Sequence, residues 1–135
     1  MAKFAATDYS VVVGGVNLST SLNSVELSLE ADDLETTAFG GEWRTKVAGL
    51  KTGSVTLNFM QDFGAGAVDA TLYPLFGTQA TVVIKPTSGT VTSTNPSYTF
   101  LANVVAYSPF ASSVGDIAQL SVSWPVAGTV TRGTV

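Results

Sequence analysis

Three stretches of the sequence alternate between apolar and small polar residues, at 24–30, 54–59 and 118–124. Because successive side chains of a β-strand point to opposite faces of a sheet, this alternation predicts three half-buried strands. Each strand should turn its apolar side to the core and its polar side to water. The residues expected in the core are Val25, Leu27, Leu29, Val55, Leu57, Phe59, Leu120, Val122 and Trp124.

The polar sides of these strands contain Ser, Thr, Asn, Gln and Glu, and no Lys or Arg. They comprise Glu26, Ser28, Glu30, Ser54, Thr56, Asn58, Gln119, Ser121 and Ser123. Phosphate binding needs clustered cationic side chains, which these positions lack. The pattern therefore predicts a hydrated sheet surface that does not hold nucleic acid.

The remaining apolar patterns complete a mainly β architecture. Further strands are expected at 9–13, 81–85, 98–107 and 128–135. One helix is expected at about residues 65–76, because Val68, Leu72 and Leu75 recur at helical spacing, and Pro74 should distort its last turn. About seven strands with one short flanking helix predict a β-sandwich or a barrel-like pair of sheets. By size, residues 1–135 form one domain.

The region from about 31 to 50 lacks a clear strand pattern and is expected to be a long interaction loop. Loops of this length are uncommon in compact domains and are usually functional or disordered. Its aromatic residues could anchor an interface, as aromatics and Arg often do, or fold back onto their own core. The candidate contact residues are Asp32, Asp33, Glu35, Phe39, Trp43 and Arg44.

The composition excludes several classes of chemistry. The chain has no cysteine and no histidine, which rules out disulfides, thiolate metal sites and a Ser–His–Asp triad. A net charge of −4 argues against a nucleic-acid-binding patch. The acidic residues near position 33 do not have the spacing of an EF-hand loop, so we expect them to meet basic residues of a neighbouring chain. We predict no catalytic residue, cofactor or metal, and no association with a membrane.

The order of several short motifs resembles the major tail tube proteins of long-tailed, siphovirus-type bacteriophages. The motifs span nearly the whole chain and are LETTAFG at 34–40, GLKTGSVTL at 49–57, LYPLFG at 72–77, YSP at 107–109, VGD at 114–116, SVSWP at 121–125 and GTVTR at 128–132. The resemblance lies in their order and spacing together.

This resemblance implies a structural virion protein, with one tail-tube-like β domain per subunit. Subunits would form hexameric rings that stack helically into a tube, and DNA would pass through the lumen on ejection without specific binding. The 31–50 loop would reach an adjacent subunit or ring, and the polar strand faces would line the lumen. The partners would be further copies of the chain and, at the tube ends, the tape measure, tail terminator and distal tail proteins. The protein would be made in the host cytoplasm and reside in the virion tail.

Two other functions remain open from the residues alone. A capsid decoration protein could use the 31–50 loop or the termini to bind a capsid. A carbohydrate-binding β-sandwich would expose an aromatic platform, but Trp124 shares a strand face with Leu120 and Val122, so it is expected in the core.

Overall fold

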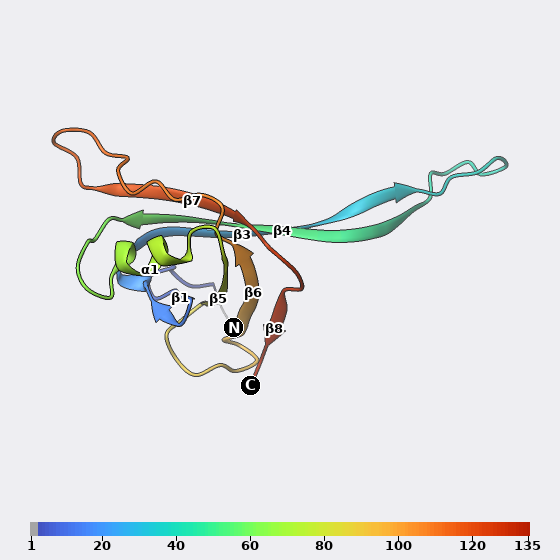
Figure 1. Ribbon diagram of the computed structural model, residues 1–135. Coiled ribbons are helices and arrows are strands. Elements are labelled where there is room, and N and C mark those ends of the chain that lie inside the picture. The colour runs from blue at the N-terminus through green and yellow to red at the C-terminus, as the bar shows by residue number, and fades with distance from the viewer. Residues whose placement is uncertain (1–2) are drawn as a thin grey trace.

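The computed structural model describes residues 3–135 and consists of two antiparallel sheets with one α-helix, which confirms the predicted β-sandwich-like fold. The elements are β1 (Ser10–Val13), β2 (Val16–Asn17), the 3₁₀ helix η1 (Ser19–Ser21), β3 (Leu22–Glu35), β4 (Lys46–Met60), α1 (Val68–Leu75), β5 (Gln79–Lys85), β6 (Ser97–Asn103), β7 (Gln119–Pro125) and β8 (Thr131–Gly133). One sheet has the strand order β3-β4-β7 and the other β2-β1-β5-β6-β8. Figure 1 shows the three-stranded sheet on one side of the body, with the helix and the second sheet on the other.

The core lies between the sheets and is built largely from the alternating strands. Six of the predicted core residues are at most 3% exposed: Val55, Leu57, Phe59, Leu120, Val122 and Trp124. These residues belong to β4 and β7, which pair with each other. Val55 lies opposite Trp124 and Leu57 opposite Val122, so the apolar sides of the two strands form one continuous surface. The period-2 pattern therefore predicted burial correctly for β4 and β7.

Strand β3 departs from this expectation. Val25 and Leu27 are only half-buried, and Leu29 is 52% exposed, so its assignment to the core was wrong. Within the described chain, β3 is an edge strand whose only sheet partner is β4. An edge strand has no neighbour to cover its outer side, and alternation alone cannot distinguish it from a central strand.

Helix α1 is shorter than the predicted 65–76 segment. Its buried side chains are Val68, Thr71 and Leu72, which attach it to the core. The N–H of Phe76 donates to the carbonyls of both Leu72 and Tyr73, at 3.1 and 3.2 Å. The last turn, which contains Pro74, is therefore tightened, and the helix ends at Leu75.

The largest difference from the sequence-based expectation is in residues 31–50. This segment is mostly strand: β3 continues to Glu35, β4 begins at Lys46, and only residues 36–45 connect them. The pairing shifts register between Ala31 and Asp33, where β4 contains one extra residue, a β-bulge. Figure 1 shows this hairpin extending well beyond the body. We call residues 31–50 the arm and residues 36–45 its tip.

Candidate assembly surfaces

The polar sides of β3, β4 and β7 form a single face, which we call the polar face. Residues that lie opposite each other on neighbouring strands form rows across this face. The rows are Ser24–Asn58–Ser121, Glu26–Thr56–Ser123, Ser28–Ser54 and Glu30–Thr52, and Gln119 lies on the same face at the start of β7. The nine predicted polar residues are all exposed or half-buried on this face. Thr56 donates a hydrogen bond across the strands to Ser123, with the two oxygens 3.4 Å apart. Two carboxylates, Glu26 and Glu30, are the charges on these rows, which gives the face a negative potential.

The sheet that carries the polar face has two unpaired edges among the described strands. Strand β3 and strand β7 each pair only with β4, and both pairings are antiparallel. The two edge strands therefore run parallel to each other. At the start of β7, the Ser112 hydroxyl accepts a hydrogen bond from the Gln119 N–H and donates one to the Gln119 carbonyl. Unpaired edge N–H and C=O groups are a template for pairing with another chain, so the rest of the β7 edge and the β3 edge are candidate contact surfaces.

The tip of the arm exposes two large aromatic side chains. Phe39 is 110% exposed and Trp43 is 84% exposed, so neither folds back onto its own core. Every residue of the arm is exposed except the half-buried Gly49. Exposed aromatic groups at the end of a projecting hairpin are typical of a contact site for another protein.

Four charged residues of the arm form two ion pairs within the hairpin. The Arg44 guanidinium Nη1 lies 3.0 Å from Glu35 Oε1, and Lys46 Nζ lies 3.2 Å from Asp33 Oδ2. The expectation that the acidic residues of this segment meet basic residues of another subunit stays a prediction. Exposed ion pairs contribute at most about 1 kcal/mol, so they mainly orient the arm.

The bulge changes which residues the arm presents. Leu34 pairs with Val47 beyond the bulge, and both are about half exposed. A Cβ at Gly49 would lie 3.0 Å from atoms of both Asp32 and Leu34, so a side chain there would force this segment apart. Alternation along β3 places Asp32 and Leu34 on the same side as Glu30, so toward the tip this side carries a further carboxylate and then the apolar Leu34–Val47 pair.

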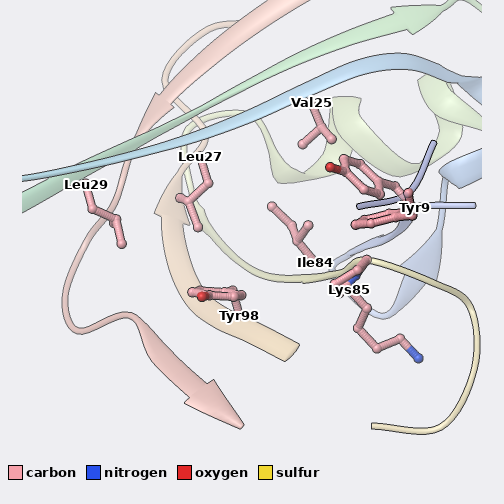
Figure 2. Close-up of a pocket in the computed structure, with 9 residues that line it drawn as sticks. Tyr9, Val25, Leu27, Leu29, Ile84, Lys85 and Tyr98 are labelled. Atoms are coloured by element: carbon pink, nitrogen blue, oxygen red, sulfur yellow. The ribbon is translucent and has the colours of Figure 1, made fainter. Parts of the chain in front are cut away.

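A second surface that the sequence did not reveal is an apolar groove beside the free edge of β3, which we call the β3 groove. It has a volume of about 540 Å³ and is lined by Phe4, Tyr9, Val25, Leu27, Leu29, Ile84, Lys85, Pro86 and Tyr98. Figure 2 shows the β3 side chains Val25, Leu27 and Leu29 facing Ile84 and Tyr98 of the other sheet. The side chain of Asp8 holds the N-terminal segment here by accepting hydrogen bonds from the N–H and hydroxyl of Ser88, which also lower the Asp8 pKa. Four separate segments of the chain line the groove, so only the fold brings its residues together.

A hydrogen-bond network fixes the segment between β6 and β7. The Tyr107 hydroxyl donates to Asp69 Oδ1 at 2.6 Å, and Gln61 Nε2 donates to the Tyr107 oxygen at 3.3 Å and to the Pro109 carbonyl at 2.9 Å. The network therefore joins the end of β4, helix α1 and the 104–118 connection. Partial burial, together with the Asp69 carboxylate, raises the pKa of Tyr107 to about 12.

This network predicts a loss of stability at high pH. Because the folded-state pKa of Tyr107 lies above its ordinary value of 10, its stabilising effect is complete below pH 10 and is lost as pH rises toward about 12. Tyr107→Phe should lower the free energy of unfolding by about 1 to 2 kcal/mol at neutral pH. Between pH 10 and about 12, the free energy of unfolding of this variant should decrease less than that of the wild-type protein. Urea unfolding across this pH range tests this. The exposed Tyr73→Phe serves as the control, and an unchanged pH profile in Tyr107→Phe would contradict the prediction.

The described residues contain few features of a chemical site. No group of three or more His, Cys, Asp or Glu side chains in residues 3–135 is arranged to hold a metal ion. Within the same residues, no helix combines the length and the apolar character needed to cross a bilayer. What these residues do present is a set of contact surfaces: the polar face, two sheet edges, the arm and the β3 groove.

These features define a two-sheet β-sandwich with a projecting hairpin, and this fold occurs in phage-like particles. No family model and no curated protein matches the sequence. A chain in a structure described as the tail of an empty gene transfer agent particle, computed with helical refinement and C6 symmetry, is 17% identical, with 85% of this chain and 83% of that chain covered and a TM-score of 0.62. A chain in the virion of a native gene transfer agent particle is 14% identical, with 98% and 100% covered and a TM-score of 0.70. The protein thus shares its fold with components of gene transfer agent particles.

Proposed function

We propose that this protein is the major tail tube protein of a phage-like particle. Copies would form rings, six to a ring, and the rings would stack helically into the conduit for DNA ejection. The observation that carries the proposal is the β3-β4-β7 sheet, whose polar face carries no cation on its cross-strand rows and lies between two edges that no other described strand pairs with. The fold likeness to a chain of a gene transfer agent tail with C6 symmetry supports it.

The sheet geometry explains how a ring can close. Strand β7 of one subunit would lie beside β3 of the next, in a parallel pairing, because the two edges run in the same direction. Repeating this contact around a ring removes all edges of this sheet. The β3 groove lies beside the same edge, so the neighbouring subunit would also cover its exposed apolar surface.

The polar face would line the lumen. Its Glu26 and Glu30 carboxylates repel phosphate groups, and its Ser, Thr, Asn and Gln side chains stay hydrated. DNA could therefore slide along the wall without specific binding. The arm would contact an adjacent subunit or ring, and the tape measure, tail terminator and distal tail proteins would bind at the tube ends. The protein would then reside in the virion tail after synthesis in the host cytoplasm.

Electron microscopy of the purified protein tests the proposal. We expect rings and tubes of constant diameter at raised concentration or moderate salt. Analytical ultracentrifugation that finds only monomers under all such conditions would contradict it. Immunogold labelling of intact particles separates the tail from the head, and head labelling would instead identify a capsid decoration protein.

A lysine on the polar face should impair DNA passage. In Ser28→Lys or Ser121→Lys particles the substitution is repeated in every subunit, which would create a cationic lumen. DNA release should slow at low ionic strength and recover with salt, by about three- to fourfold between 50 and 200 mM for each phosphate contacted. The exposed Ser93→Lys in the β5–β6 connection is the control. Equal release rates in all variants would show that this face points away from the lumen.

A further inference from the structure

The end of the body opposite the arm carries a second exposed aromatic site. The rings of Phe63 and Phe110 stack with their centroids 5.5 Å apart and an angle of 27° between their planes. Phe63 is 55% exposed and Phe110 is 85% exposed. We call this pair the aromatic platform. Aromatic rings that stack on each other and yet remain open to water offer a surface on which further aromatic groups can pack.

The platform is held in position by the network described above. Gln61 lies two residues before Phe63, and its side chain donates to the carbonyl of Pro109, the residue before Phe110. Tyr107, three residues before Phe110, donates to Asp69 of helix α1. These bonds hold the chain next to both aromatic residues against the body before any partner binds, which reduces the ordering cost of a contact.

The platform and the tip of the arm lie at opposite ends of the same strand. Strand β4 starts at Lys46, next to the tip, and ends at Met60, next to the loop that contains Phe63. Phe110 belongs to the connection that leads into β7, whose residue Gln119 pairs with Met60. In Figure 1 the arm points to one side and the loops that precede β7 and follow β4 lie at the other.

We propose that the aromatic platform is the receptor for Phe39 and Trp43 of a second copy of this chain in the adjacent ring. This inference rests on the proposed tube. If rings close through the β3 and β7 edges, their strands run along the tube with the tilt of about 35–45° typical of barrels. The arm of each subunit then points to one neighbouring ring, and its platform points to the other.

Such a contact joins the tip of one copy of the chain to the platform of another copy, head to tail. Contacts of this kind do not close on themselves and generate open filaments. Both surfaces are aromatic at their centres, and charged residues border them: Asp62 precedes Phe63, and Glu42 and Arg44 flank Trp43. Every ring inside a tube would use both surfaces, and only the terminal rings would leave a free tip or a free platform.

The absence of cysteine from the chain allows a direct test in assembled tubes. A Glu42→Cys/Ala111→Cys double variant keeps all four aromatic side chains and places the thiols on exposed residues next to Trp43 and Phe110. On oxidation it should form a ladder of covalent multimers of more than the six subunits of one ring, seen on non-reducing gels. The single variants should give dimers at most, and Glu42→Cys/Ser93→Cys should give no ladder. Tubes that form normally without a ladder in the first variant would overturn the inference and leave the proposed function intact.

A second variant tests the contact without a cross-link. Phe63→Ser/Phe110→Ser should give rings of normal diameter that need at least tenfold more protein to stack, and Phe39→Ser/Trp43→Ser should behave alike. Val114→Ser, a fully exposed change in the same connection, is the control. Normal stacking of the platform variant would overturn the inference. If the wild-type protein formed no rings, the proposed function itself would fail.

Discussion

Replacing residues 32–50 with Asn-Gly is expected to abolish tube formation while the body stays folded. Ala31 and Lys51 are register partners, so a two-residue turn can join them, and Asn-Gly favours the turn type that matches the twist of a hairpin. The removed residues include the exposed Phe39 and Trp43 and none of the buried core. In the proposed tube they supply the contact to the adjacent subunit or ring.

The body should tolerate this deletion because the arm contributes almost nothing to its stability. Its ion pairs are solvent-exposed, and shortening the loop changes the closure entropy by less than about 2 kcal/mol. Circular dichroism and urea unfolding should show a folded protein with similar stability, whereas electron microscopy should show no tubes. Normal tubes from the shortened chain would exclude the arm from assembly, and an unfolded chain would show that the arm stabilises the body.

Trp124→Ala is expected to cause the largest loss of stability, about 3 to 5 kcal/mol in the free energy of unfolding. Trp124 is 0% exposed, packs in the core and donates a 2.9 Å hydrogen bond from its indole N–H to the Ala106 carbonyl. Its removal leaves a cavity between the two sheets that the surrounding strands cannot fill. Because folded domains are typically stable by about 5–15 kcal/mol, this variant should be close to unfolding.

The second tryptophan of the chain is the matched control. Trp43 is 84% exposed at the tip, so Trp43→Ala should change the stability of the monomer by less than about 0.5 kcal/mol. Urea unfolding followed by circular dichroism at concentrations below assembly compares the two variants. Equal midpoints would contradict the assignment of Trp124 to the core. The pair of variants also separates folding from assembly, since only Trp43→Ala should weaken tubes without weakening the subunit.

The parts of the fold that the sequence predicted are those that depend on local pattern. Alternation in β4 and β7 identified which side of each strand is buried, and the helical spacing of Val68 and Leu72 located α1. The same pattern misplaced Leu29, because exposure of an edge strand depends on what lies beside it. The arm was mistaken for a loop because Asp, Gly and Lys are poor strand formers. In the structure, these residues adopt strand conformation because β3 and β4 pair with each other along the hairpin.

The surfaces that carry the proposals required the fold. The aromatic platform joins Phe63 and Phe110, which are far apart in the chain, and the β3 groove joins the N-terminal segment to three strands. The ion pairs Arg44–Glu35 and Lys46–Asp33 depend on the hairpin register beyond the bulge. No local pattern marks such residues, because each contact is set by where a distant segment lies.

The sequence by itself determined that three strands are half-buried and that their polar sides carry no cation, because alternation and side-chain charge are local properties of the chain. The tertiary structure decided that these sides form one continuous face, that β3 and β7 are its edges, and that the exposed Phe39 and Trp43 lie toward one end of it and Phe63 and Phe110 toward the other. Pairing partners, edges and ends are set by contacts between distant segments, and the free energy of burying the shared core selects those contacts.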